Sequence, residues 1–112
     1  MYNLIQLPKI CDKRGNLSFA QNEDQIPFNV TSVYWTYAIP GGEKNPPKLI
    51  EKHEMIIVLS GSIRVTIKDI SGKSRSLVRL NRSFWGLHVY PNNWLAIDEI
   101  STNTFCLQLC GC

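Results

Sequence analysis

Hydrophobic and polar residues alternate along several short stretches of the chain, the pattern of β-strands that bury one face. The clearest case is Ile63–Lys68, in which each apolar side chain is followed by a polar one. In Thr104–Cys110, two cysteines and a glutamine share the face opposite the two leucines. The run Met55–Leu59 is apolar on both faces and is predicted to be a central strand. No window has the spacing of an amphipathic helix, so we expect almost no helix beyond a short turn at Asn22–Gln25.

Turn-forming residues separate these stretches, and they include Gly15-Asn16, Pro40–Gly42, Pro46-Pro47, Gly61, Ser71-Gly72 and Pro91–Asn93. The strand-like runs between the turns are Val30–Ile39, Met55–Leu59, Ser62–Ile70, Ser76–Leu80, Trp85–Tyr90 and Thr104–Leu109. Short strands at this spacing predict a β-sandwich or barrel. Because a single small sheet would leave its edges exposed, we expect two sheets that close into a jelly roll.

The composition fits one compact domain over residues 1–112, since 44% of the residues are hydrophobic and 19% are charged. No apolar run is long enough to cross a membrane as a helix, so we expect no membrane partner. The N-terminus lacks the basic lead-in of a signal peptide, which favours a cytoplasmic protein. The net charge of +3 comes from dispersed basic residues, a distribution that argues against nucleic-acid binding.

Three of the four cysteines, Cys106, Cys110 and Cys112, lie close together near the C-terminal end, whereas Cys11 is distant. Their spacing has neither a Cys-x-x-Cys pair nor a histidine partner, so it gives little support for a metal site. We expect the cysteines to pack as small hydrophobic side chains in a reducing compartment. We therefore predict no metal and no cofactor.

Several motifs of one known family are spread over nearly the whole chain. They are Asp12–Leu17, Ile26–Phe28, Val33-Tyr34, Val58–Ser62, Gly86–Val89 and Pro91–Trp94. With these motifs the sequence resembles the nucleotide-sugar 3,4-ketoisomerases, the WxcM-like cupins. The resemblance implies a cupin-type jelly roll (a double-stranded β-helix), a dTDP-linked 4-keto-6-deoxyhexose as ligand, and a place in the synthesis of polysaccharide sugars. It also implies a homodimer in which N-terminal strands, here Tyr2–Lys9, reach the partner.

The sequence departs from this family where the family carries its acid–base groups. The family's His-x-His is replaced by Pro47-Lys48-Leu49, and its Trp-His pair by Trp94-Leu95. Moving a ketone from C4 to C3 requires a group that removes the C3 proton and returns a proton to C4. Histidine does this near neutral pH with the least tuning. The histidines that remain are His53 and His88.

Three side chains are candidates for proton transfer: His88, Glu54 and Lys48. His88 stands where the family has a tyrosine, and it either reaches the mouth of the cavity or is a satisfied core or rim residue. Glu54 is either a pocket acid or a buried carboxylate held by Lys52 or Arg64. Lys48 would act as a base only if burial removed its proton.

Adjacent residues on a regular strand point to opposite faces. If Glu54 enters the barrel, His53 therefore lies at the surface or at an interface. Aromatic side chains can stack on a sugar or on a thymine ring. We predict four substrate-binding residues, of which Lys44 aligns with an arginine of the family: Tyr34, Tyr37, Lys44 and Trp94.

Three functions remain open. The chain is an isomerase with an altered acid–base set, a non-catalytic cupin that binds a sugar nucleotide or another small molecule, or a structural dimerisation scaffold. The fold alone does not choose among them, because cupins host many functions. We favour a homologue of the dTDP-4-keto-6-deoxyhexose 3,4-ketoisomerases with altered or lost catalysis.

Overall fold

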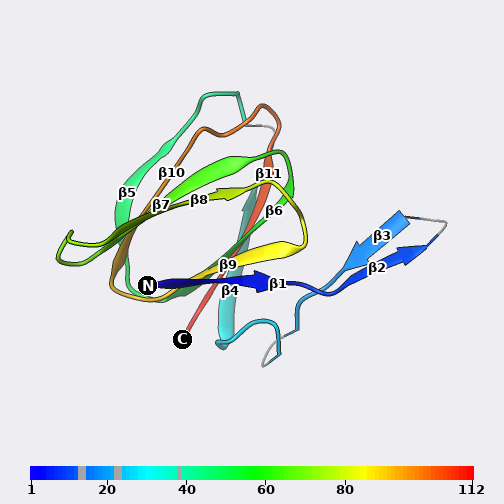
Figure 1. The fold of residues 1–112 in the computed structure, drawn as a ribbon, viewed down its shortest axis with the longest axis horizontal. Helices are drawn as coiled ribbons and strands as arrows, with labels where there is room; N and C mark the ends of the chain where they lie inside the picture. Colours follow the sequence, from blue (N-terminus) through cyan, green and yellow to red (C-terminus); the bar gives the residue numbers. More distant parts are fainter. Residues whose placement is uncertain (13–14, 22–23, 38) are drawn as a thin grey trace.

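Figure 1 shows the computed structural model of the protein, which describes residues 1–12, 15–21, 24–37 and 39–112. The strands are β1 (Tyr2–Gln6), β2 (Lys9–Asp12), β3 (Gly15–Ser18), β4 (Val30–Thr36), β5 (Asn45–Ile50), β6 (His53–Ser60), β7 (Ile63–Asp69), β8 (Arg75–Leu80), β9 (Trp85–Val89), β10 (Asn93–Asp98) and β11 (Phe105–Gly111). The described residues contain no helix, and hence none that could span a membrane. The predicted all-β class is confirmed.

A few residues used in the sequence predictions lie outside the described part of the chain. They are Lys13 and Arg14 of the motif Asp12–Leu17, Asn22 and Glu23 of the predicted turn, and Ala38 of the run Val30–Ile39. Each strand-like run predicted above overlaps one observed strand. Strand β1 lies within the N-terminal segment Tyr2–Lys9 that the family resemblance implied to be strand. Strands β2, β3, β5 and β10 were not predicted.

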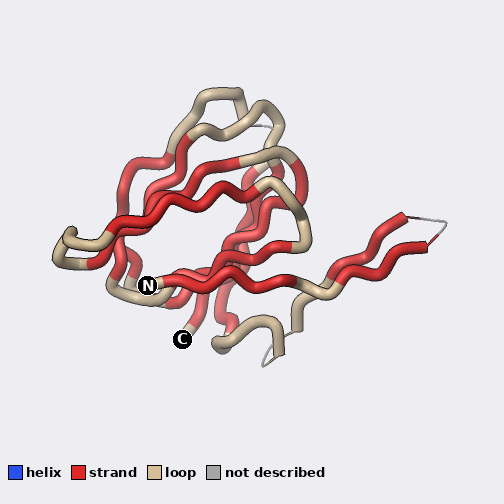
Figure 2. The backbone as a smooth tube through the Cα atoms, viewed as in Figure 1, coloured by secondary structure: helices blue, strands red, loops and turns tan. Residues whose placement is uncertain are grey.

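Two antiparallel sheets form the body of the molecule. The first has the strand order β1-β9-β6-β11-β4, and the second has the order β5-β10-β7-β8. Figure 2 shows both sheets curving around a common interior. This is the closed jelly roll that the alternating pattern and the turn spacing predicted.

Alternating side chains of the two sheets fill that interior. Along β7, Ile63, Val65 and Ile67 are buried in the core, whereas the polar residues between them face outward. The facing strand β6 contributes Ile56 and Val58 to the same core. Each such fully buried side chain stabilises the fold by about 1.5–3 kcal/mol. The predicted alternation of Ile63–Lys68 is confirmed.

A second apolar cluster covers the outer face of the five-stranded sheet. It contains Met55 and Ile57 of β6 together with Phe28, which precedes β4. Strand β6 therefore buries side chains on both of its faces, and it lies in the middle of its sheet between β9 and β11. This position confirms the central strand predicted for Met55–Leu59.

Strands β2 and β3 form a separate hairpin that projects from the body (Figure 1). Ile10 and Leu17 face each other across this hairpin and are 52% and 58% exposed. Strand β1, by contrast, pairs along its whole length with β9 of the same chain. Most of the predicted partner-reaching segment Tyr2–Lys9 is thus part of the chain's own sheet, and the projecting element is the hairpin.

Candidate functional site

Four polar side chains meet inside the barrel next to β4 and β5, each of which is one of the two edge strands of its sheet. At the centre lies the carboxylate of Glu54, which is 5% exposed. Its Oε1 atom accepts hydrogen bonds from Tyr34 Oη at 3.2 Å, Lys48 Nζ at 3.3 Å and Cys110 Sγ at 3.5 Å. We call these four residues the interior cluster.

The strand registers bring the interior cluster together. Cys110 on β11 lies directly opposite Glu54 on β6. Tyr34 on β4 lies opposite Gln108, which is two residues from Cys110 and therefore on the same face of β11. Lys48 enters from β5, on the other sheet. Side chains from both sheets thus converge on one buried carboxylate.

The two oxygens of Glu54 have different surroundings. Oε1 accepts all three hydrogen bonds of the cluster, whereas Oε2 is buried and has no partner among the described residues. The side chain of Lys48 is 54% exposed and supplies a positive charge from the solvent side. Within the described residues, no three His, Cys, Asp or Glu side chains come close enough to hold a metal ion.

The neighbours of Glu54 are held in their protonated forms. Burial, together with the Glu54 carboxylate, raises the pKa of the Tyr34 phenol. Burial and the same carboxylate raise the pKa of the Cys110 thiol. Because the neutral forms are favoured, both groups act as hydrogen-bond donors to the carboxylate.

Two hollows adjoin the interior cluster. The larger has a volume of about 620 Å³ and is lined by Tyr37, Asn45 and Gln108, among others. The smaller has a volume of about 300 Å³ and is lined by Glu54 and Cys110, among others. Since Gln108 and Cys110 follow each other on one face of β11, the two hollows are consecutive along that strand.

Three of the seven predicted site residues, Tyr34, Lys48 and Glu54, belong to the interior cluster. Glu54 combines the two predicted alternatives, because it is a buried carboxylate that also lines a hollow. The partners predicted for it were wrong. The contact is made by Lys48, whereas Arg64 binds the carboxylate of Asp98 with two hydrogen bonds of 2.8 and 2.7 Å. Lys52, the other predicted partner, is exposed.

Both histidines lie on the opposite face of the five-stranded sheet, outside the barrel. His53 Nδ1 is 2.8 Å from His88 Nε2. The ring of Phe28 packs on both imidazoles, with centroid distances of 5.5 and 5.4 Å. The prediction that His53 points away from the interior when Glu54 points into it is confirmed. His88 is buried on this outer face of the sheet, against Phe28, and does not lie at the mouth of the interior.

The remaining predicted residues do not touch the interior cluster. Tyr37 lies at the rim of the larger hollow, with its ring 6.1 Å from that of Phe105. Lys44 is exposed on the loop before β5. Trp94 alternates with buried neighbours on β10, so it faces outward, where it lines a separate hollow of about 420 Å³ with Lys68. The prediction of Trp94 as a residue of the interior pocket is therefore corrected.

Sequence reasoning missed Cys110 as a member of the site. It was predicted to pack as a small apolar side chain, but its thiol lies against the Glu54 carboxylate. The available signal was the alternation in Thr104–Cys110, which places Cys110 on the same face as Gln108. The sequence did not show which strand would lie opposite.

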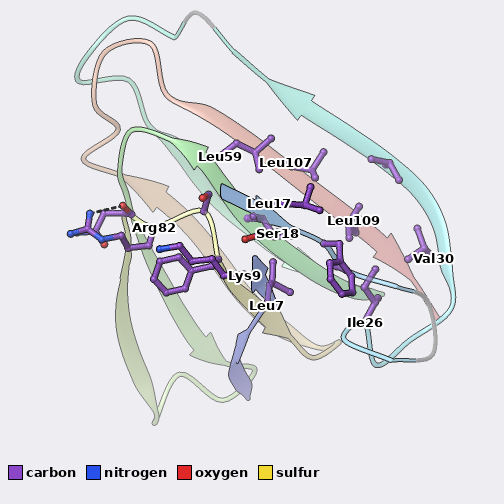
Figure 3. Close-up of a pocket in the computed structure, with 17 residues that line it drawn as sticks. Leu7, Lys9, Leu17, Ser18, Ile26, Val30, Leu59, Arg82, Leu107 and Leu109 are labelled. Atoms are coloured by element: carbon purple, nitrogen blue, oxygen red, sulfur yellow. Dashed lines mark hydrogen bonds between the residues drawn. The ribbon is translucent and has the colours of Figure 1, made fainter. Parts of the chain in front are cut away.

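A further hollow, of about 850 Å³, lies outside the barrel. Among the residues that line it, Figure 3 labels Leu59, Leu107 and Leu109 of the five-stranded sheet and Leu17 of the hairpin. Its lining is mainly apolar, and Arg82 is among its few charged residues. We call this hollow the outer groove.

The chain matches known proteins over nearly its whole length. A family profile described as "FdtA: WxcM-like, C-terminal" matches residues 1–111. The TDP-4-oxo-6-deoxy-alpha-D-glucose-3,4-oxoisomerase of Aneurinibacillus thermoaerophilus is 30% identical over 107 residues, which cover 95% of this chain and 76% of that protein.

Solved structures show the same fold. The TDP-quinovose 3,4-ketoisomerase WlaRB from Campylobacter jejuni superposes with a TM-score of 0.92 at 24% identity, covering 99% of this chain and 85% of that chain. The sugar 3,4-ketoisomerase QdtA from Thermoanaerobacterium thermosaccharolyticum, solved in complex with TDP, gives a TM-score of 0.89 at 23% identity, covering 98% and 80%. The family profile and the 30% identical relative show that this chain belongs to the WxcM-like FdtA family and is a homologue of the TDP-sugar 3,4-ketoisomerases of deoxysugar biosynthesis.

Proposed function

We propose that the chain binds a TDP-linked 4-keto-6-deoxyhexose inside the barrel and that its proton transfer is altered relative to a histidine-based isomerase. One observation carries the proposal: the interior holds a carboxylate, a phenol, an ammonium group and a thiol, while both histidines lie outside. Homology to the Aneurinibacillus enzyme supports the class of ligand. The complex of QdtA with TDP supports the nucleotide part.

The chemistry of such a ligand suits the two hollows. A TDP-hexose carries a diphosphate, a flat thymine ring and a sugar with hydroxyl and carbonyl groups. The aromatic rim residue Tyr37 suits stacking on a ring, and the ammonium group of Lys48 suits a phosphate. Tyr34 and Glu54 offer a donor and an acceptor to the sugar. Lys44, exposed on the loop before β5, adds a positive charge close to Lys48 in the sequence.

Ligand-dependent thermal unfolding tests the proposal. TDP and TDP-4-keto-6-deoxyglucose should both raise the Tm, since a ligand at one hundred times its Kd stabilises the folded state by about 2.7 kcal/mol. Lys48→Met should weaken TDP binding roughly tenfold, about 1.4 kcal/mol, through loss of a phosphate contact. The matched control Trp94→Ala, on the outer face of the other sheet, should bind like the wild type. A Tm unchanged by either ligand would contradict the proposal and favour the third function, a structural dimerisation scaffold.

We also propose that two copies form a homodimer through the outer groove. Val33, Leu59 and Leu17 line this groove and are substantially exposed in the single chain. Contiguous exposed apolar surface of this kind marks an interface between proteins. The hairpin that bounds the groove projects from the body and exposes further apolar side chains, including Ile10 (Figure 1). A two-fold axis would let each hairpin cover the groove of the other copy, since such an interface uses the same surface twice.

A further inference from the structure

We infer that Oε2 of Glu54 is the atom that accepts the C3 proton of the bound 4-keto sugar and later delivers a proton to C4. This inference rests on the ligand proposed above and assigns the base that replaces an imidazole. It follows from the unequal surroundings of the two carboxylate oxygens, from the position of Glu54 at a hollow, and from the phenol beside it.

The first step concerns how the carboxylate is held. Three donors from three different strands, Tyr34, Lys48 and Cys110, all bind Oε1. In the ligand-free protein Oε1 is thus fixed from three directions. Cys110 keeps its bond to Oε1 when Lys48 and Tyr34 turn to the ligand, so Oε2 keeps a defined position. Oε2 is buried and has no hydrogen-bond partner among the described residues. A buried acceptor without a donor is costly, and such an atom in a native structure calls for a role such as catalysis.

The second step concerns access. Glu54 lines the smaller hollow together with Lys48. Lys48 is the exposed member of this ion pair, with 54% of its side chain accessible against 7% for Glu54. The ammonium group can therefore leave Oε1 for a ligand phosphate without crossing the packed core. Its departure opens the approach to the carboxylate as the ligand enters.

The third step is the reaction, which needs only protons. The C3 proton moves to Oε2, and the electrons of the C3–H bond form a C3=C4 double bond. The electrons of the carbonyl move to O4, which takes the proton of the Tyr34 phenol, giving an enediol and a phenolate. The carboxyl proton of Glu54 exchanges with the solvent. The phenolate then takes the proton of O3, C3 becomes the carbonyl, and Glu54 delivers a proton to C4. Atoms and charges balance, and no oxidant or reductant takes part.

Tyr34 and Cys110 have different tasks in this scheme. Tyr34 Oη donates to Glu54 over 3.2 Å in the ligand-free protein. In the scheme this hydroxyl turns to the sugar oxygens, where it is the proton donor and acceptor. Cys110 does not reach the sugar in this scheme. It is a positioning residue, because its thiol only orients Oε1.

Deuterium incorporation tests the inference. The wild type and TDP-4-keto-6-deoxyglucose are incubated in deuterated water, and the proton at C3 is followed by NMR above the enzyme-free background. We expect Glu54→Gln to slow incorporation by at least about 100-fold, the usual range for loss of a general base. Its TDP-induced rise in Tm should remain, because the glutamine oxygen still accepts the bonds made to Oε1. Glu99→Gln, which removes an exposed carboxylate outside the interior cluster, should exchange like the wild type.

The outcomes separate this inference from the proposed function. If Glu54→Gln exchanges as fast as the wild type, the inference is wrong and the ligand assignment stands. A wild type that binds TDP without any exchange also overturns the inference and leaves a binding protein. The absence of any TDP-induced change in Tm overturns the proposed function itself. If circular dichroism shows that Glu54→Gln is unfolded, Glu54→Asp replaces it, because this variant keeps the charge but withdraws the carboxylate by one methylene group. Exchange should then fall on the order of 100-fold, and wild-type exchange would overturn the inference.

Discussion

His53 Nδ1 and His88 Nε2 lie 2.8 Å apart on the outer face of the five-stranded sheet, so one of these nitrogens donates and the other accepts. If both imidazoles carried a proton on each nitrogen, the N–H groups of His53 Nδ1 and His88 Nε2 would face each other. The rings of Phe28 and Tyr90 enclose His88, at 5.4 and 4.4 Å between centroids, and leave it 1% exposed. Burial, the neighbouring His53 and the N-terminal amino group lower the pKa of His88 to about 4.

This depressed pKa predicts that the protein loses stability in mild acid. Unfolded His88 has a pKa near its usual value of about 6.5, so between that pH and the native pKa of about 4 the unfolded state binds more protons. The free energy of unfolding should therefore be unaffected by this group above pH of about 6.5. Between about pH 6.5 and the native pKa of about 4, the free energy of unfolding should fall by up to roughly 1.4 kcal/mol for each pH unit. Urea titrations of the wild type and His88→Phe between these pH values measure the effect, and an equally steep slope in both would contradict it.

Tyr34→Phe should slow isomerisation while preserving binding. The substitution removes the hydroxyl that donates to Glu54 Oε1 over 3.2 Å and that protonates O4 in the scheme above. We expect deuterium incorporation at C3 to fall by about 10²–10⁴-fold, with the TDP-induced rise in Tm retained. Tyr90→Phe is the matched control, because its hydroxyl accepts a hydrogen bond from Asn3 outside the barrel. Equal losses in the two variants would show that Tyr34 has no special role.

The fold was predictable from local features of the sequence, because alternation and turn residues are read within a few positions. The alternation of Ile63–Lys68 correctly predicted which of its side chains point into the core. The adjacency of His53 and Glu54 correctly predicted that the two point to opposite faces of the sheet. Strand β5 was missed because its two prolines were interpreted as turn residues, although an edge strand tolerates proline. Strand β10 was missed because it begins at Asn93, whose side chain donates to the carbonyl of Tyr90 and joins the turn to the strand.

The candidate site was only partly predictable, because its contacts depend on how distant strands pair. Glu54 and Cys110 are 56 positions apart in the sequence, and only the register of β6 and β11 sets them opposite each other. The face to which His88 points depends likewise on the pairing of β9 with β6. Trp94 was misplaced for the same reason, since the phase of alternation in β10 is set by its pairing with β5 and β7.

Gly61→Ala should destabilise the fold more than Gly72→Ala. Both glycines have positive φ angles, +88° and +76°, which disfavour any side chain. At Gly61 a Cβ atom would also lie 2.4 Å from Thr104 Oγ1, whereas at Gly72 it would meet nothing within 4 Å. Gly72→Ala should therefore cost about 1 kcal/mol, and Gly61→Ala clearly more. Thermal unfolding of the two variants measures the difference, and equal Tm values would show that the turn next to Thr104 relaxes freely.

Leu59→Glu should convert the proposed homodimer to single chains without unfolding them. Leu59 lines the outer groove and is 45% exposed in one copy, so a carboxylate there is solvated in the monomer but would be buried without a partner in the dimer. Sedimentation at several concentrations should give twice the mass of the chain for the wild type and a single mass for the variant. Leu77→Glu, at a similarly exposed leucine of β8 in the other sheet, is the matched control and should remain dimeric. A wild-type mass of one chain at every concentration, or dissociation of both variants alike, would contradict an interface at the outer groove.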